Sequence, residues 1–496
     1  MQQKLKIFLA YSEVAPFTKT GGVGDVGGAL PKYLKEQGHD VRVITPQYRG
    51  INERRYILRD VIRLQDIEIS LGDEIVPVNV KSAFLPNSKV QVYFLDYKPF
   101  FFRTGIYGHP ETGQPYDDNA ERYILFSKSV LETLKKLQWQ PDVIHCNNWQ
   151  TALIPFLLRT QYRDDPFFQS VSSLLTVHNF HEYGLFPSSS IASMNLDEDA
   201  VGLLRPKNGK LSFLSAGLQY ANYVNAVNES CYKQILGNAG KTSFFRGIIN
   251  SREKIFVNID NGTDDTVWNP ETDPFIKTSF TVDALENKKD NKQALMESLS
   301  LPYDTVPAQP LILVQSKPGD EKEEETILSA IAELLKQGLF IVVLYDVAHR
   351  ITKKYKQLQK SHKKQMAVLE TNEKTLHQSL AGSDILLSLF QKEDTLHVAM
   401  HAMQYGTLPV ASCITGIEDI ITTCHTKTML GNGEIFEGHS VKAIIGAIKR
   451  MLKLYSSSNW QAYVVNAMNT KFSWEEASRQ YCQVYEKCVA DQKKNN

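Results

Sequence analysis

Short apolar runs alternate with amphipathic stretches along this chain. Residues 5–10 form an apolar run, and a helical pattern over residues 25–37 ends at Gly38, where a helix C-cap glycine is expected. Residues 40–46 form a second apolar run that ends at a proline. A strand, a glycine-rich loop, a helix and a second strand make a βαβ unit, which predicts a parallel sheet.

Two further apolar runs each end in a histidine. Residues 141–145 end at His145, and residues 174–178 end at His178. Because ligands of open parallel sheets bind at the carboxyl ends of the strands, we expect both histidines near one crevice if these strands are neighbours. For either histidine taken alone, we favour a buried ring that the backbone satisfies.

The same alternation restarts in the second half of the chain. Strands are expected at residues 311–314, 340–344, 384–389 and 407–411, and a helix is expected at residues 323–337. The predicted architecture is α/β, with a Rossmann-like domain over residues 1–265, a linker over 266–290, a second Rossmann-like domain over 291–475, and a C-terminal helix and polar tail over 476–496. Ligands are expected in a cleft between the two domains.

Composition and charge narrow the class of protein. The 55 basic residues balance 55 acidic ones, so the chain lacks the basic footprint of a nucleic-acid binder. A neutral polymer substrate fits this balance, and so do many other partners. Six cysteines without a CxxC pair predict reduced thiols rather than a disulfide framework or a zinc site. No apolar run is long enough to span a membrane. We therefore expect a cytoplasmic protein that binds neither nucleic acid nor membrane.

The loop after the first strand carries the clearest candidate chemistry. Residues 19–25 read Lys-Thr-Gly-Gly-Val-Gly-Asp and open a helix. Glycines let the backbone approach a ligand, a helix N-terminus presents N–H groups to an anion, and Lys19 adds a positive charge. The spacing differs from the dinucleotide and P-loop patterns, so neither NAD binding nor ATP hydrolysis is indicated. A tight turn that binds nothing explains the spacing equally well.

This loop lies in a segment that resembles the N-terminal signature of bacterial glycogen synthases and plant starch synthases. The segment is KIFLAYSEVAPFTKTGGVGDVGGALPKYLKEQGHDVRVITPQY. The resemblance covers nearly the whole chain and returns at YDDNAERYILFSKSVLE, PDVIHCNNWQTAL, LLTVHNF, FLSAGLQYANYVNAV, IDNGTDDTVWNPETDP and FSWEEASRQYCQVYEK.

Members of this family are retaining glycosyltransferases of the GT-B fold, in which two Rossmann-like domains face each other across a cleft. The resemblance therefore implies a glycogen synthase that transfers glucose from ADP-glucose to the non-reducing end of an α-1,4-glucan such as glycogen. It implies no metal and no other cofactor, and it leaves the oligomeric state open.

The resemblance also assigns residues of the donor site. Lys19 matches the lysine that holds the distal phosphate of ADP-glucose, and Gly21 and Gly22 match the glycines that let the diphosphate approach. His178 and Asn179 match the pair that touches the transferred glucose.

Two further motifs belong to the same half of the chain. Asn261 matches an asparagine near the transferred sugar. His145, Asn147 and Trp149 match a motif that lines the cleft, in which the family usually has aspartate where this chain has Asn148. Within these motifs, a role in the site is favoured for both histidines over a purely structural one.

The C-terminal half departs from the family on its nucleotide side. The family's Ser-Arg-Leu-x-x-Gln-Lys-Gly appears as SKPGDEKE over residues 316–323, which keeps the phosphate-clamping lysine as Lys322 but places Lys317 where the family has arginine. Arginine offers a rigid bidentate fork and lysine a flexible point charge, so this exchange is not conservative at a diphosphate.

Three other motifs on the nucleotide side are altered. Glu-Pro-Cys-Gly-Leu appears as EDTLH, which keeps the glutamate that faces the sugar ring as Glu393, and Thr-Gly-Gly appears as ITG, which keeps only Gly416. A Gly-x-Gly motif appears as YDV over residues 345–347. The predicted catalytic residues are His178, Glu393, Lys322 and Lys317.

These departures leave two alternatives to an active ADP-glucose-dependent synthase. One is a catalytically weak or inactive paralogue that binds glucan or partners a true synthase. The other is a glycosyltransferase that uses a different nucleotide.

Overall fold

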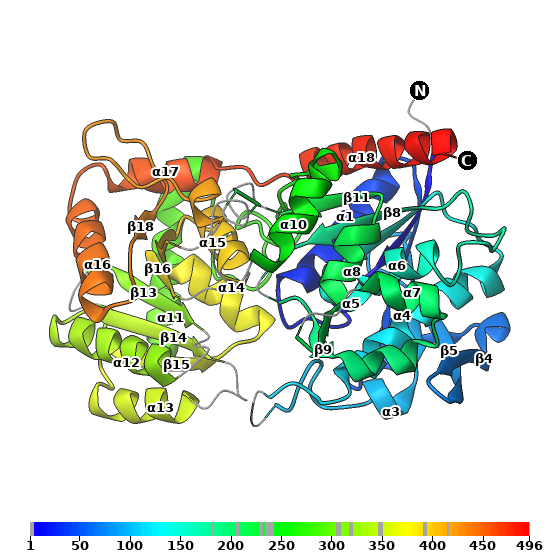
Figure 1. The fold of residues 1–496 in the computed structure, drawn as a ribbon. Coiled ribbons are helices and arrows are strands. Elements are labelled where there is room, and N and C mark those ends of the chain that lie inside the picture. Colours follow the sequence, from blue (N-terminus) through cyan, green and yellow to red (C-terminus); the bar gives the residue numbers. More distant parts are fainter. Residues whose placement is uncertain are drawn as a thin grey trace. The chain divides into compact units, whose positions relative to one another are not determined.

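The computed structural model describes residues 4–110, 112, 114–180, 182–204, 208–227, 232–233, 243–303, 309–316, 321–345, 351–389, 394–413 and 416–495. The chain divides into two compact units, each with its own sheet and core (Figure 1). The first unit comprises Met1–His109, Gln114–Gly262 and Ser473–Asn496, and the second comprises Pro110–Gly113 and Thr263–Phe472. No helix in the described part of the chain is long and apolar enough to cross a membrane.

A ten-stranded sheet forms the centre of the first unit. Its order is β12-β11-β8-β7-β1-β2-β6-β5-β3, with β4 paired to β5. Neighbours from β12 to β6 are parallel, whereas β5 pairs antiparallel with β3, β4 and β6. The strands are β1 Lys6–Ala10, β2 Asp40–Pro46, β3 Arg59–Asp60, β4 Ile67–Leu71, β5 Glu74–Phe84, β6 Gln91–Asp96, β7 Val143–Asn147, β8 Ser172–Val177, β11 Tyr223–Ala226 and β12 Phe256–Val257. A separate ribbon pairs β9 Leu185–Pro187 with β10 Lys210–Ser212.

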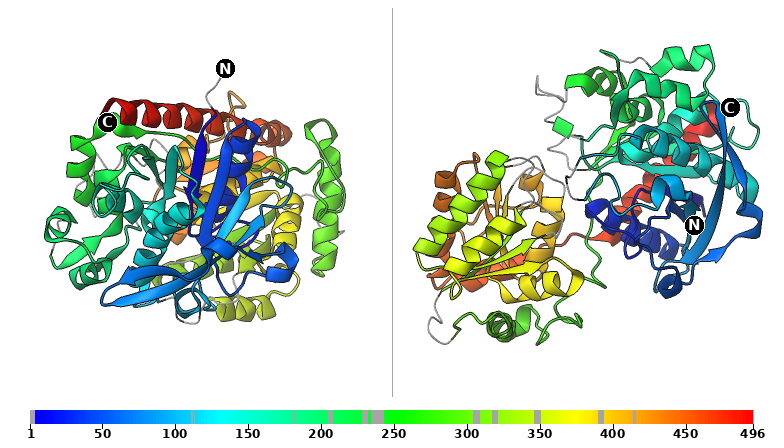
Figure 2. Two further views of the ribbon diagram at one scale, coloured as in Figure 1. Left: turned by 90° about the vertical axis from the view of Figure 1, so that its right-hand side faces the viewer. Right: turned by 90° about the horizontal axis from the view of Figure 1, so that it is seen from below.

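Helices pack on this sheet in two groups. One group pairs α1 with the C-terminal helix α18, and the other gathers α4, α6 and α8 (Figure 2). The helices of the first unit are α1 Gly22–Glu36, α2 Glu53–Tyr56, α3 Lys98–Phe101, α4 Asn119–Leu137, α5 Asn148–Thr151, α6 Leu153–Arg159, α7 Glu198–Leu204, α8 Phe213–Tyr220, α10 Ser243–Ser251 and α18 Trp474–Asn495. Short 3-10 helices are η1 Ile62–Leu64, η2 Ser188–Met194 and η3 Glu253–Ile255.

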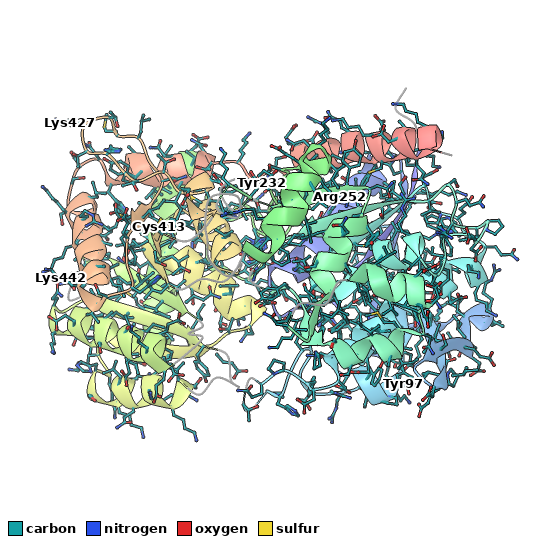
Figure 3. The ribbon with its side chains drawn as sticks, in the orientation of Figure 1. Tyr97, Tyr232, Arg252, Cys413, Lys427 and Lys442 are labelled. Carbon is teal, nitrogen blue, oxygen red and sulfur yellow. The ribbon has the colours of Figure 1, made fainter. Side chains whose placement is uncertain are left out.

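The C-terminal end of α8 is capped by a cation from a distant part of the chain. Arg252 follows α10 (Figure 3). It donates hydrogen bonds of 2.6 Å to the carbonyl oxygen of Leu218 and 2.7 Å to that of Ala221. The last carbonyls of a helix lack intrahelical partners, and a positive charge there is favourable. The guanidinium therefore fixes the end of α8 next to the strand that follows it.

The order of the first sheet has one topological switch point. From β1 the chain adds β2 and then β6 on one side, and it returns to add β7, β8 and β11 on the other side. The connections that follow the neighbouring strands β1 and β7 therefore run to opposite sides of the sheet. Ligands of such sheets bind in the crevice between the loops that follow these two strands.

The second unit is built on a six-stranded parallel sheet with the order β15-β14-β13-β16-β17-β18. This is the Rossmann order, with its switch point at β13 and β16. The strands are β13 Leu311–Ser316, β14 Phe340–Tyr345, β15 Met366–Glu370, β16 Ile385–Leu389, β17 Leu408–Ser412 and β18 Glu434–Phe436. The helices are α11 Lys288–Ser298, α12 Glu321–Lys336, α13 Thr352–Ser361, α14 Glu373–Gly382, α15 Asp394–Gln404, α16 Val441–Tyr455 and α17 Trp460–Asn469, with 3-10 helices η4 Val282–Asn287 and η5 Ile417–Asp419.

Strand β13 shows why both faces of this sheet are apolar. Ile312 and Val314 belong to one buried cluster, whereas Leu311 and Leu313 belong to another. Side chains of a strand alternate between the two faces, so an uninterrupted apolar run predicts a strand covered on both sides. The two-domain α/β architecture with parallel sheets that the sequence predicts is confirmed.

The boundary between the units differs from the predicted one. Residues 266–290, expected as a linker, belong to the second unit. Trp268 and Phe280 are 6% and 1% exposed within a core cluster of that unit, so this polar and proline-marked stretch is anchored by its few large apolar side chains.

The C-terminal segment also differs from its description as a helix and a polar tail. Helix α18 runs from Trp474 to Asn495 and belongs to the first unit, where Tyr481, Tyr485 and Cys488 are fully buried. These residues recur at helical spacing, so one face of a polar helix completes the core of the N-terminal sheet.

Candidate functional site

The Lys19 loop lies in the connection from the carboxyl end of β1 to α1, at the switch point of the first sheet. Gly21 is the N-cap of α1, with φ −150° and ψ −172° and no side-chain cap, and Gly22 is the first helical residue. The Nζ atom of Lys19 lies 2.7 Å from Oδ1 of Asp25 in the first turn of α1. The loop thus places a lysine, ion-paired with an aspartate, beside a helix N-terminus, whose N–H groups suit an anion.

At the glycines of α1, the connection from β1 packs closely against the helix backbone. A Cβ atom on Gly27 would lie 2.7 Å from the carbonyl oxygen of Glu13, and one on Gly28 would lie 2.6 Å from that of Ala15. A Cβ atom on Gly24 would lie 3.1 Å from Cβ and Cγ of Lys19. These close approaches require residues without a side chain, so the glycine-rich start of α1 fixes the path of the loop.

His178 is the centre of a hydrogen-bonded cluster at the ends of β7 and β8. Its Nε2 atom lies 3.0 Å from Oδ1 of Asn147, and its Nδ1 atom lies 3.2 Å from Nδ2 of Asn261. The backbone N–H of His178 donates to Oδ1 of Asn148 over 2.8 Å. Since Nδ2 of an asparagine is a donor, the ring accepts from Asn261 at Nδ1 and donates to Asn147 from Nε2. The structure therefore brings together three predicted residues, His178, Asn147 and Asn261, and the partly exposed Asn179 follows directly.

The surroundings of Asn148 accept asparagine where the resemblance implies aspartate. The residue has φ +54°, in the left-handed region that asparagine and aspartate enter more readily than other side chains. Its Oδ1 atom, which accepts the hydrogen bond from His178, has an equivalent in either side chain. The exchange therefore keeps both the backbone conformation and the bond that positions His178.

His145, predicted to line the cleft, lies instead in the core of the first unit. Its side chain is fully buried, with Nδ1 lying 2.7 Å from the hydroxyl of Tyr485 and Nε2 lying 2.7 Å from Oγ1 of Thr176. Burial lowers the pKa of His145 to about 3, so the ring is neutral at physiological pH. This histidine joins helix α18 to β7 and β8, and hydroxyl side chains rather than backbone groups satisfy it.

Trp149, also predicted to line the cleft, packs in the same core. The side chain is 8% exposed, and its ring centroid lies 4.9 Å from that of Tyr123 and 5.4 Å from that of Phe186. A Cβ atom on Gly184 would lie 2.6 Å from the indole, so the β9 segment closes over it. The indole therefore supports the loop after β7 rather than a ligand.

The predicted residues of the second unit follow its central strands. Lys322 is the second residue of α12, which follows β13, and its side chain is exposed. Gly416 follows β17 with φ +88°, a conformation that favours glycine and explains why this glycine is kept. Lys317 and Glu393 lie outside the described residues, but they come directly after β13 and four residues after β16, the neighbouring strands of the switch point.

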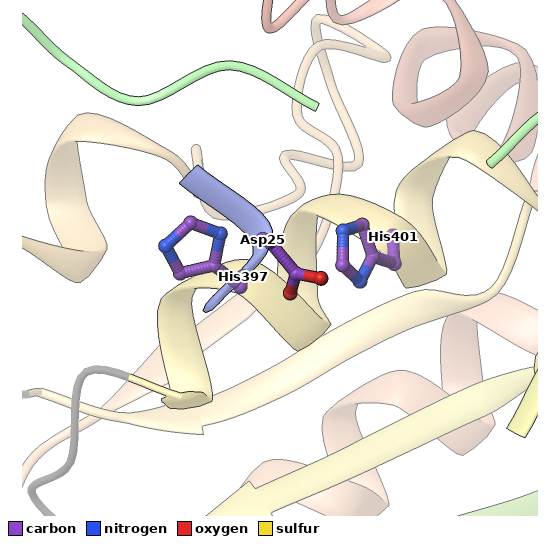
Figure 4. Close-up of side chains that lie close together, drawn as sticks. All are labelled: Asp25, His397 and His401. Atoms are coloured by element: carbon purple, nitrogen blue, oxygen red, sulfur yellow. The ribbon is translucent and has the colours of Figure 1, made fainter. Parts of the chain in front are cut away.

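Helix α15, which begins one residue after Glu393, is anchored by an aromatic stack. His401 lies one turn beyond His397 on this helix (Figure 4). The ring of His401 stacks on Trp268 at 3.7 Å between centroids, and His377 stacks on the same indole at 4.2 Å. The indole is thus sandwiched between two imidazoles, which holds α15 against the segment around Trp268.

A buried hydrogen-bonded group completes this anchor. Nδ1 of His377 lies 2.7 Å from Oδ2 of Asp273 and 2.9 Å from the hydroxyl of Tyr405. Burial and the bond to Asp273 raise the pKa of Tyr405, which therefore acts as a donor. This group was not predicted, because the segment around Trp268 and Asp273 is polar and marked by prolines, a pattern that indicates a linker.

Comparison with known families agrees with the two units. Residues 6–247 match the family described as starch synthase catalytic domain, and residues 304–464 match glycosyl transferases group 1. The catalytic domain of starch synthase IV from Arabidopsis thaliana, solved with bound ADP and acarbose, matches with a TM-score of 0.87 and 27% identity over 98% of this chain and 100% of that one. The fold and the family matches define the protein as a two-domain α/β glycosyltransferase.

Full-length relatives identify the family more narrowly. The glycogen synthase of Chlorobium limicola is 31% identical over 99% of this chain and 100% of its own length. The glycogen synthase of Syntrophotalea carbinolica is 33% identical over 98% of this chain and 99% of its own. The chain belongs to the glycogen synthase family.

Proposed function

We propose that this enzyme transfers glucose from ADP-glucose to the non-reducing end of an α-1,4-glucan such as glycogen, with retention at the anomeric carbon. The observation that carries the proposal is the Lys19 loop, which joins a lysine to a helix N-terminus at the switch point of a Rossmann-like sheet. The similar starch synthase IV, which was solved with ADP and acarbose, supports the choice of donor and of acceptor.

On the donor side, the diphosphate meets the Lys19 loop. The ammonium group of Lys19 holds the distal phosphate, and the backbone at Gly21 and Gly22 allows the diphosphate to approach the positive end of α1. As the bond to glucose breaks, negative charge grows on the departing diphosphate. A donor that is already in place stabilises this charge without reorganisation.

The transferred glucose lies against the cluster around His178. His178, Asn179 and Asn261 contact the sugar, and Asn147 acts through the ring of His178, whose orientation it fixes. Because His178, Asn147 and Asn261 are buried and His178 is hydrogen-bonded to both asparagines, these three side chains keep a single arrangement before substrate arrives, which lowers the entropy lost on binding.

Residues of the second unit supply further charge and shape. We assign Lys322 and Lys317 to the phosphates, Gly416 to a backbone contact with the nucleotide, and Glu393 to the sugar ring. Lysines suffice to balance the leaving diphosphate, so the proposed reaction needs no metal and no other cofactor.

The proposed setting is the cytoplasm, with neither nucleic acid nor membrane as a partner. The described cysteines are all unpaired, and of these only Cys413 is exposed, which fits a reducing compartment.

A donor panel tests the proposal directly. The purified chain is incubated with glycogen and with ADP-, UDP- or GDP-glucose, and proton NMR follows the anomeric signals of the product. We expect turnover to be fastest with ADP-glucose and every new linkage to be α-1,4. Preference for UDP- or GDP-glucose would overturn the assigned donor, and a β-linked product would overturn retention.

A further inference from the structure

The buried carboxylate of Glu13, which has no assigned role, is hydrogen-bonded to the Lys19 loop. Glu13 lies in the connection between β1 and α1 and is 3% exposed. Its Oε1 atom accepts a hydrogen bond of 2.8 Å from Oγ1 of Thr20, and its Oε2 atom accepts from the backbone N–H of the same residue. Thr20 stands directly between Lys19 and Gly21, so one side chain holds the middle of the loop by two bonds.

A tyrosine from a distant segment holds this carboxylate in turn. The hydroxyl of Tyr107 donates to Oε1 of Glu13 and lies 2.8 Å from Oγ of Ser12. The carbonyl oxygen of Tyr107 accepts a hydrogen bond of 2.8 Å from Nδ2 of Asn119, at the start of α4. Through Glu13, Tyr107 therefore connects the Lys19 loop to the first turn of α4.

The segment that carries Tyr107 is itself fixed by a fully buried arginine. Arg122 donates over 2.8 Å to the carbonyl oxygen of Ile106, over 2.9 Å to that of Phe100 and over 2.6 Å to Oδ1 of Asn119. A guanidinium with all of these acceptors sets the segment rigidly against α4. The chain of contacts thus runs from Arg122 through Tyr107 and Glu13 to Thr20.

We propose that Glu13 and Tyr107 are positioning residues that set the Lys19 loop for the diphosphate of the sugar donor. Glu13 is buried and already accepts from Thr20 and Tyr107, so it acts through the loop rather than on the substrate. A loop fixed before the donor arrives loses little entropy on binding, which favours donor affinity specifically. The inference rests on the proposed function, because it takes the Lys19 loop to bind the donor's phosphates.

The test compares Glu13→Gln and Tyr107→Phe with the unaltered chain. Glutamine places an amide N–H where a carboxylate oxygen accepts, and phenylalanine removes only the hydroxyl. Glu13→Gln replaces a charged hydrogen-bond acceptor with a neutral one. Because hydrogen bonds to charged groups are among the stronger ones, we expect this variant to raise the KM for ADP-glucose about tenfold to a hundredfold. Tyr107→Phe should raise it about threefold to tenfold. The KM for glycogen should stay within about twofold, since the proposal assigns the loop to the phosphates of the donor.

Tyr162→Phe is the matched control. The hydroxyl of Tyr162 donates over 2.8 Å to Oε1 of Glu132 in the same unit, so this variant removes the same kind of tyrosine–glutamate bond away from the loop. It should leave both KM values unchanged, and the melting temperatures of all three variants show whether folding is affected. Parallel changes in both KM values, or an unchanged KM for ADP-glucose in Glu13→Gln, would overturn the positioning role.

Calorimetry with ADP separates this inference from the proposed function. If the unaltered chain transfers no glucose, the proposed function fails, while weaker binding of ADP to Glu13→Gln than to Tyr162→Phe still supports the positioning role. Equal affinity of these two variants for ADP would overturn it.

Discussion

The parallel strands of the two units follow the same Rossmann-like order, but the units differ in how their candidate residues are held. In the first unit, His178, Asn147 and Asn261 are buried and bonded to one another at the strand ends. In the second unit, Lys322 is exposed on α12, and Gly416 is kept at a position where the backbone needs glycine. The departures that the resemblance implies fall mainly on motifs in the second half of the chain.

This difference has a physical reason. Replacing one member of a buried polar cluster leaves its partners unsatisfied, at about 1–3 kcal/mol for each buried group. An exposed side chain such as that of Lys322 carries no such penalty, because water satisfies its polar atoms when a partner is lost. The first unit therefore accommodates an exchange such as the asparagine at position 148, which keeps the hydrogen bond to the backbone of His178.

The largest effect is expected for Lys19→Ala. Removal of a charged partner of the diphosphate should raise the KM for ADP-glucose about a hundredfold, while the affinity for glycogen changes little. Initial-rate kinetics with each substrate varied in turn measures both. Lys35→Ala is the control, because Lys35 also belongs to α1 but pairs with Asp40 at the other end of the helix. Equal losses for donor and glycogen would remove Lys19 from the phosphate role.

The next effect is a pH dependence that originates in the core of the first unit. The pKa of His145 is about 3 in the folded protein and about 6.5 in the unfolded chain, so the unfolded chain binds the extra proton as the pH falls below 6.5. Stability is lost on the acid side, by about 2 kcal/mol at pH 5 relative to neutral pH.

His145→Gln should remove this part of the acid destabilisation. Thermal unfolding of both proteins at pH 7 and pH 5 gives the difference, and His439→Gln serves as control because His439 is exposed. If the two proteins lose the same stability between these pH values, the buried ring of His145 is not the group that titrates.

A gain is expected for Lys317→Arg in the second unit. Arginine restores the bidentate fork that the family has at this position, so kcat/KM for ADP-glucose should rise about fivefold to tenfold. Lys353→Arg, an exposed lysine of α13, controls for a general effect of arginine. Unchanged or lower activity would show that the loop has adapted to lysine and that the exchange does not limit the rate.

The smallest effect is expected for Asn148→Asp, which restores the family's residue in the first unit. Oδ1 can accept the bond from His178 in either case, so activity should stay within about threefold of the unaltered chain. A loss of more than about tenfold would mean that the amide N–H of Asn148 is needed. Melting temperature and kcat together distinguish a local defect from a general one.

Much of the fold could be predicted because its signals are local. The apolar run that gives β13 and the turn at Gly38 lie within one window of sequence, and the structure contains the corresponding elements. The return of α18 to the first unit has a local signal too, since Tyr481, Tyr485 and Cys488 recur at helical spacing. What the spacing does not contain is which sheet this face covers.

The site could be predicted only in part, for a related reason. Motifs indicate that His145 and His178 follow neighbouring strands, but one ring points into the core and the other meets Asn147 and Asn261. The alternation of a strand separates two faces, and only the structure shows that Tyr485 of a distant helix covers the face of His145. The role of Glu13 could not be predicted, because one of its partners, Tyr107, lies far along the chain.

The transfer of radiolabelled glucose from ADP-glucose to glycogen by the purified chain tests the proposed function most directly. The proposed function requires that the first unit, together with the charges kept in the second, suffices for synthesis. It predicts label in glycogen that an α-1,4-specific hydrolase releases. No label from ADP-, UDP- or GDP-glucose, while the chain still binds glycogen, would contradict it and identify the protein as an inactive glucan-binding paralogue.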